Sequence, residues 1–135
     1  MKPRGLRNNN PGNIRNSDAT DWIGEVKAPK KKDNAFEEFE TMAHGYRALI
    51  KLLQNYRKKH KCRTIADFIN RWAPRTENDT TAYILTVCRT LEVPSDYVPD
   101  VNDESTMCAI AAAISLVENG VEANMDEVKA GWKML

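Results

Sequence analysis

The sequence has few of the residues on which metal, thiol and phosphate chemistry depends. Its two histidines, His44 and His60, have no carboxylate or cysteine at metal-ligand spacing. Its three cysteines, Cys62, Cys88 and Cys108, are odd in number and far apart, which indicates free thiols. It lacks a glycine-rich phosphate loop and a Gly-x-Ser-x-Gly elbow. We therefore expect neither a metal nor another cofactor.

An excess of one charge is also missing. Lys and Arg number 20 and Asp and Glu 19, giving a net charge of +1, and we expect no nucleic acid partner. Basic residues cluster at 27–32 and 57–61, which is typical of solvated loops or helix ends, with binding of an anionic polymer as the alternative. The longest apolar run is too short for a bilayer and no signal peptide precedes the first motif, so we expect no membrane insertion and synthesis in the cytoplasm.

The length and periodicity predict one domain over residues 1–135, with an α+β fold that is mostly helical. Residues 1–40 are expected to form a lobe of loops and a small N-terminal antiparallel sheet, with extended pieces at 13–15, 22–26 and 35–39. Residues 41–135 are expected to form a lobe of about five helices. Thr41, Thr64 and either Asp79 or Thr80 can begin the first three, and apolar periodicity places two more at 107–120 and 125–135.

Glu118 is the most unusual residue of the helical lobe. At 100° per residue it lies within about a 60° arc of Met107, Ala111 and Ile114, on an almost wholly apolar helix that Gly120 can end. An ionised carboxylate buried without a partner is costly, so this one must be paired, protonated or functional. A carboxyl group against apolar walls can serve as a general acid. The alternative is a helix-end glutamate whose tip reaches solvent or an Arg or Lys.

Three polar segments could accompany Glu118 in a site. Asn9, Asn10 and Asn13 offer amide groups of the kind that bind sugar hydroxyl and N-acetyl groups, or they form a rigid self-bonded turn. Trp22 could stack on a sugar ring or lie in the core, and Glu25 beside it could be a second carboxylate, as glycoside hydrolysis commonly requires.

The third segment runs from Arg71 through Glu77 to Thr80, and Tyr83 follows it. Residues 77–80 can cap the next helix, or they can contact a ligand together with Tyr83. Both interpretations are open at the level of sequence.

Several motifs together are similar to those of a known group. RGLRNNNPGNIR, WIGE, FEEF with AHGYRAL, and RWAPRTENDTTAYI resemble small phage virion-associated and lysis-type proteins from Arg4 to about Leu91. More distantly, Asn9–Ile14 and Ala73–Tyr83 resemble segments of peptidoglycan-cleaving glucosaminidases and muramidases of the lysozyme superfamily. In those enzymes a helix carrying the general acid precedes the asparagine segment, and here AIAAAISLVENG at the other end of the chain is similar to it.

The resemblance implies a circularly permuted lysozyme-like domain with Glu118 at the acid position, although Asn119 stands where the enzymes tend to have a small hydroxyl residue. It implies a peptidoglycan glycosidase or lytic transglycosylase that acts on the glycan strand at the bacterial cell wall, reached through a virion or another delivery apparatus. Glu25 is the candidate second carboxylate. Two alternatives stay open: a non-catalytic virion or glycan-binding module, and a partner-binding protein that uses its basic segments.

Overall fold

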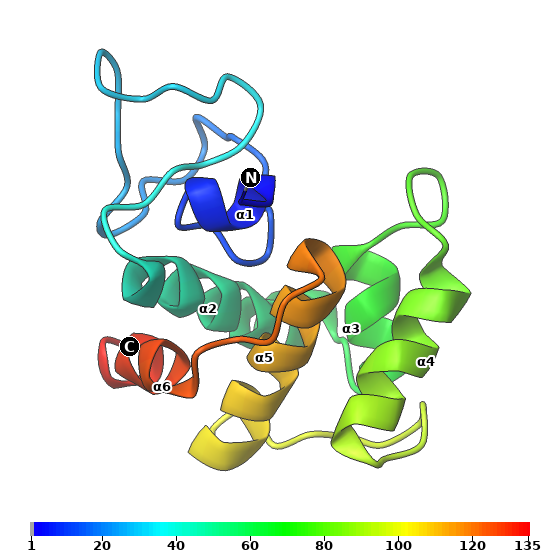
Figure 1. Ribbon diagram of the computed structural model, residues 1–135. Helices are drawn as coiled ribbons and strands as arrows, with labels where there is room; N and C mark the ends of the chain where they lie inside the picture. Colours follow the sequence, from blue (N-terminus) through cyan, green and yellow to red (C-terminus); the bar gives the residue numbers. More distant parts are fainter. Residues whose placement is uncertain (1) are drawn as a thin grey trace.

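The computed structural model describes residues 2–135, and this part of the chain contains six helices and no strand (Figure 1). The helices are α1 (Arg4–Arg7), α2 (Met42–His60), α3 (Ile65–Trp72), α4 (Thr80–Leu91), α5 (Glu104–Asn119) and α6 (Met125–Lys133). The predicted α+β class with a small N-terminal antiparallel sheet is therefore wrong. The short helix α1 was not expected. Residues 2–40 form the N-terminal lobe, which apart from α1 is irregular chain above α2 in Figure 1.

The expected strands fail because their pairing never extends into a ladder. Two isolated antiparallel bridges, Arg15 with Phe36 and Glu25 with Phe39, are what remains of the predicted sheet within the described residues. Within the expected strands, the side chains of Asn9 and Asn10 bond backbone groups of Ile14, Glu37 and Phe39. Such local side-chain bonds offer the backbone an alternative to a ladder, and the turn-rich composition of this lobe favours them.

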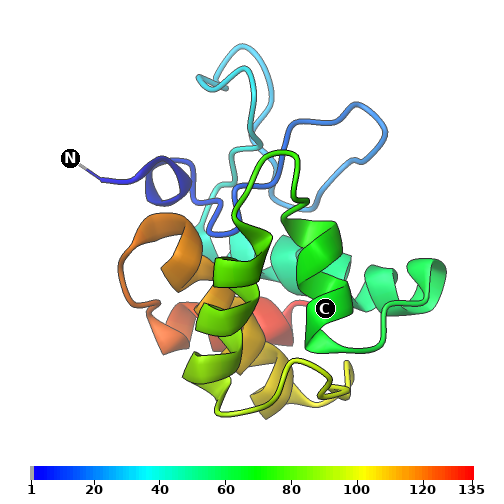
Figure 2. The ribbon, with the colours of Figure 1, turned by 90° about the vertical axis from the view of Figure 1, so that its right-hand side faces the viewer.

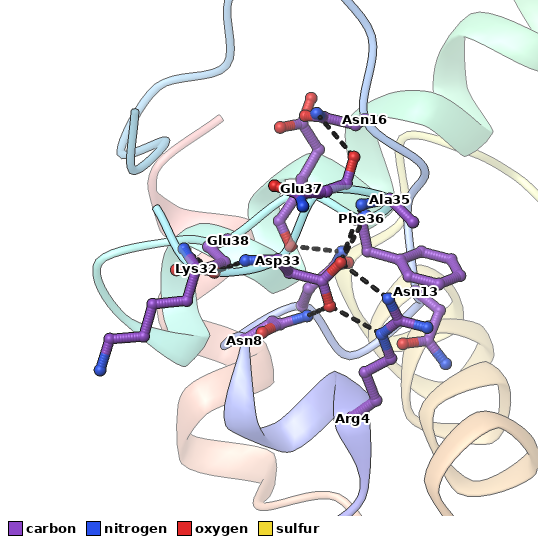
Figure 3. Close-up of polar contacts among 12 residues, drawn as sticks. Arg4, Asn8, Asn13, Asn16, Lys32, Asp33, Ala35, Phe36, Glu37 and Glu38 are labelled. Carbon is purple, nitrogen blue, oxygen red and sulfur yellow. Dashed lines mark hydrogen bonds and ion pairs between the residues drawn. The ribbon is translucent and has the colours of Figure 1, made fainter. Parts of the chain in front are cut away.

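Asp33 organises the N-terminal lobe around its carboxylate (Figure 3). It accepts hydrogen bonds from Arg4 Nε at 2.6 Å and Nη2 at 2.8 Å, and from Asn8 Nδ2 at 2.9 Å. The backbone amides of Ala35 and Phe36 donate to the same group. The Arg4 guanidinium is the main reason that the pKa of Asp33 lies well below its ordinary value. These bonds fix α1 to the loop that precedes α2.

The helix starts in residues 41–135 follow the predicted caps. The side chains of Thr41, Thr64 and Asp79 each accept a bond from a backbone amide in the first turn of α2, α3 and α4 respectively. Gly120 ends α5 with a φ of 69°, as predicted for a left-handed cap. The predicted helices beyond residue 40 are thus confirmed, with α5 beginning three residues earlier than expected.

Helix α2 is the centre of the helical lobe. It packs against α5 and α6, while α4 packs between α5 and α3, and Figure 2 shows the same grouping from the side. The core includes Leu49 and Ile50 of α2, Ile69 of α3 and Ile114 of α5, all fully buried. Among the described residues, no helix is long and apolar enough to cross a membrane.

Candidate functional site

A cleft of about 400 Å³ separates the N-terminal lobe from the helical lobe, and we refer to it as the interlobe cleft. Residues 12–15 and Phe36 form one side. Much of the other side is formed by Tyr56, Trp72, Ala73, Pro74, Glu77 and Asn78. Glu118 also lines the cleft. Its size lies in the range typical of small-molecule sites, and it combines aromatic surface with a few polar groups.

Glu118 reaches the cleft because it lies in the last turn of an otherwise apolar helix. Met107, Ala111 and Ile114, which share its helical face, are buried as predicted, whereas Glu118 is partly exposed. The core contacts of α5 thus hold the helix in place, and its last turn reaches the lobe boundary. In this way the fold presents a carboxylate at the cleft.

Two hydrogen bonds fix the Glu118 carboxylate. Asn13 Nδ2 donates to Oε1 at 2.8 Å, and the Tyr83 hydroxyl donates to Oε2 at 2.8 Å. Tyr83 comes from α4 and is only 5% exposed. Burial, and after it the charge of Glu118, raises the pKa of Tyr83 far above its ordinary value, so this hydroxyl remains a donor.

A second cavity, of about 310 Å³, also borders Glu118. Tyr83, Asn78 and Val117 line it together with Glu118, and Asn78 and Glu118 belong to both cavities. Glu118 therefore borders both cavities.

Asn119 joins α5 to the turn at residues 9–13, which we call the asparagine turn. Its Nδ2 donates to the Pro11 carbonyl at 3.0 Å and to the Ser115 carbonyl at 3.0 Å. An added Cβ on Gly5 would come within 2.4 Å of Asn119 Oδ1, so α1 also approaches α5 closely here. These contacts bring the asparagine turn beside Glu118, although the two segments lie near opposite ends of the chain (Figure 1).

Of the three predicted asparagines, Asn13 lines the cleft, whereas Asn9 and Asn10 bond backbone groups within the N-terminal lobe. Asn10 is fully buried, and its Nδ2 donates to the Ile14 and Glu37 carbonyls. Asn9 donates to the Phe39 carbonyl at 3.0 Å. The side-chain amides of Asn9 and Asn10 therefore bond backbone groups, and neither residue lines the cleft.

Trp22 and Glu25 are brought to each other rather than to Glu118. Glu25 Oε1 accepts a bond from the Trp22 backbone amide at 2.9 Å, and neither residue lines the cleft. The Trp22 side chain packs against a small apolar cluster formed by Ile14 and Phe39.

Glu77 does line the cleft, where its Oε1 lies 3.6 Å from Arg15 Nη2. Arg15 comes from the N-terminal lobe and Glu77 from the α3–α4 loop, which rises toward that lobe in Figure 2. This exposed ion pair spans the two sides of the cleft.

The sequence did not predict that Trp72 and Tyr56 line the cleft together, and we refer to these two residues as the aromatic wall. The ring centroids of Trp72 and Tyr56 lie 6.1 Å apart. Trp72 also packs closely against Gly12, where an added Cβ would come within 2.5 Å of Trp72 Cζ2. Tyr56 belongs to the apolar stripe of α2, which indicates core, and Trp72 ends a short helix. The Trp-Ala-Pro sequence that follows Arg71 was the available signal for Trp72. That Trp72 faces a cleft depends on the packing of the N-terminal lobe.

Within residues 2–135, no group of histidine, cysteine, aspartate and glutamate side chains could hold a metal ion. All three cysteines are free and buried. Burial raises the pKa values of their thiols, so these cysteines are poor nucleophiles.

Comparison with known proteins assigns the chain to a phage group. No protein-family profile matches it. It is 38% identical over 132 residues to "Protein P5" of Pseudoalteromonas phage PM2, an alignment that covers 96% of this chain and 80% of the phage protein. The chain therefore belongs to the family of this phage protein.

Proposed function

We propose that this phage-family protein cleaves the glycan strand of bacterial peptidoglycan, with Glu118 as the general acid that protonates the leaving glycosidic oxygen. The observation that carries the proposal is the position of Glu118. Its carboxylate is held by Asn13 and Tyr83 at the boundary of two cavities, beside an aromatic wall. A polymer that crosses this boundary would bring a glycosidic bond to an oriented carboxyl group.

The two donors fit the state that a general acid reaches after it has given up its proton. Asn13 and Tyr83 are already positioned to bond the two oxygens of the resulting carboxylate. Such preorganised donors stabilise charge as it develops, without reorganisation at the moment of reaction. When the enzyme must act as a base in a later step, the same bonds hold the carboxylate in place.

The second group of the reaction has two candidates. Glu25, the residue expected from sequence, does not line the cleft, whereas Glu77 does. Hydrolysis by the usual route uses a second carboxylate to activate water or to stabilise the oxocarbenium ion. A lytic transglycosylase outcome would instead need Glu118 alone as acid and base.

The aromatic wall supports a sugar ligand. Trp72 and Tyr56 line the cleft beside a carboxylate and the side-chain amides of Asn13 and Asn78, a combination suited to pyranose rings with hydroxyl and N-acetyl groups. As a proposal, the protein would act at the cell wall after delivery by the phage. The kinship with the lysozyme superfamily stays a prediction.

Digestion of purified peptidoglycan by the wild type and by Glu118→Gln tests this function. General acid catalysis contributes about 10²- to 10⁴-fold, so we expect the variant to lose at least about 100-fold in the release of soluble fragments. Glu122→Gln, which changes an exposed glutamate four residues away, is the matched control and should retain activity. Unchanged cleavage by folded Glu118→Gln, or an inactive wild type, would exclude the proposal.

The products separate the two chemical routes. Hydrolysis leaves a reducing sugar end, whereas transglycosylation leaves an anhydro end, and mass spectrometry of the fragments distinguishes them. If the wild-type fragments carry reducing ends and Glu77→Gln is inactive, the second carboxylate is Glu77. An active Glu77→Gln with anhydro ends would assign both steps to Glu118.

A second candidate function is a non-catalytic virion module that binds glycan. The observation in its favour is that Glu118 accepts a bond from Asn13 of the N-terminal lobe and another from Tyr83 of α4, so it also has a structural role at the lobe boundary. In that case the wild type binds peptidoglycan without cleaving it, and Glu118→Gln lowers the stability of the fold more than it lowers binding.

A further inference from the structure

We propose that Arg71, at the aromatic wall of the interlobe cleft, is a subsite for a carboxylate carried by the sugar strand. The inference rests on the proposed glycan ligand and adds the recognition of an acidic substituent. Arg71 lies in the last turn of α3, directly before Trp72, and it lines the cleft. An anionic substituent on a sugar stacked at this wall would meet its guanidinium.

The Arg71 guanidinium is oriented by its neighbours. It lies over the Tyr56 ring, 5.2 Å from the ring centroid, and its Nη2 is 3.2 Å from His60 Nε2. A guanidinium that stacks on an aromatic face keeps its planar set of donors and loses less entropy when it binds an anion. Arg71 is also exposed and lines the cleft, so a ligand there can reach it.

Arg71 also differs from the other arginines nearby because it has no acidic partner. The ion pairs found in residues 2–135 involve Arg4, Arg15 and Lys27. Arg57, which directly follows Tyr56 in α2, donates to the backbone carbonyls of Cys62, Arg63 and Pro99 and is thereby used by the fold. Arg71 is the cleft-lining arginine whose charge no carboxylate within this part of the chain neutralises.

The chemistry of this position selects a carboxylate next to a sugar ring. Guanidinium and carboxylate groups pair through two parallel hydrogen bonds, which are shorter and stronger than bonds between neutral groups. In peptidoglycan such a carboxylate has two sources: the peptide stem, or the lactyl group of a sugar from which the stem has been removed. A neutral N-acetylated sugar strand has neither.

Binding measurements in the Glu118→Gln background test the subsite without any need for cleavage. Three probes are titrated: the disaccharide–tripeptide from peptidoglycan, the same disaccharide without peptide, and N,N′-diacetylchitobiose. Tryptophan fluorescence reports binding at the Trp72 wall. We expect Arg71→Gln to weaken binding of the carboxylate-bearing probe about tenfold or more, as loss of a charge-assisted bond implies, and to leave the chitobiose affinity unchanged.

The two acidic probes identify the source of the carboxylate. A selective loss with the tripeptide probe assigns the subsite to the stem, and a selective loss with the peptide-free disaccharide assigns it to the lactyl group. Lys59→Gln removes an exposed charge from the C-terminal end of α2, next to His60. It should leave the affinities for both acidic probes unchanged. Arg71→Lys should recover only part of the loss, because an ammonium lacks the planar fork.

Three results would exclude the subsite. They are an equal loss of affinity for all three probes in Arg71→Gln, the same loss in Lys59→Gln, and a Glu118→Gln parent that binds none of the probes. Selective loss by Arg71→Gln together with an inactive wild type would retain the subsite and reject only the catalytic role of Glu118. Equal unfolding transitions of Arg71→Gln and its parent verify that the fold is intact.

Discussion

Asn13 Nδ2 lies 2.8 Å from Glu118 Oε1, although 105 residues separate the two in sequence. The bond joins the N-terminal lobe to the end of α5 and orients the carboxylate on which the proposed chemistry depends. Tyr83 completes this arrangement from a third element.

Asn13→Gly tests the role of this bond. Asn13 has a φ of 51°, a conformation that glycine adopts without strain, so the variant removes the side chain and leaves the turn possible. Because hydrogen bonds to charged groups contribute about 1.5–3 kcal/mol, we expect about a 10- to 100-fold loss of peptidoglycan cleavage. Asn9→Gly, at a φ of 51° outside the cleft, is the control, and a larger loss of cleavage there would contradict the assignment.

Tyr83→Phe removes the second donor to Glu118 while keeping the buried ring. We expect the free energy of unfolding to fall by about 1–2 kcal/mol and cleavage to fall by about tenfold, measured by urea titration and by fragment release. Tyr97→Phe, at a residue that is 38% exposed, should change neither quantity. Full activity in Tyr83→Phe would show that Asn13 alone positions the carboxylate.

Glu37→Gln should stabilise the protein at neutral pH. Glu37 is fully buried, and neither oxygen accepts a well-aligned hydrogen bond within residues 2–135. Burial, and after it the charge of Glu25, raises the pKa of Glu37 above its ordinary value of 4.5, against a smaller opposing effect of the Ser17 amide. A raised pKa means that stability present below pH 4.5 is lost as the pH rises through the higher folded value.

Thermal unfolding from pH 4 to 7 measures this effect, and the increase in Tm caused by Glu37→Gln should disappear at about pH 4. Glu122→Gln, at an exposed site, should show no such trend. A decrease in Tm at pH 7 would mean that the ionised Glu37 has a stabilising partner.

Asp33→Asn should have the opposite pH dependence. Arg4 keeps the pKa of Asp33 well below its ordinary value of 3.8, so its contribution is present above pH 3.8 and is lost as the pH falls toward the folded value. We expect a lower Tm at pH 7 and a deficit that shrinks below pH 3.8. Hydrogen exchange should increase in residues 4–36, and a deficit independent of pH would contradict the assignment.

Local chemistry predicted the helices beyond residue 40 well. Threonine and aspartate caps, apolar periodicity and Gly120 act within one or two helical turns, so they can be read from neighbouring residues. The N-terminal lobe did not follow its pattern, because the paired segments are short and asparagine and aspartate side chains compete for their backbone groups.

The sequence was sufficient to single out Glu118 as a carboxylate on an apolar helix, and to single out the asparagine turn and Tyr83 as polar groups that needed an explanation. Tertiary packing alone decided that Asn13, rather than Asn9 or Asn10, bonds Glu118, and that Trp72 and Arg71 face the same cleft. The reason is that these contacts join segments far apart in the chain. Their geometry depends on how the lobes pack, and no local spacing encodes it.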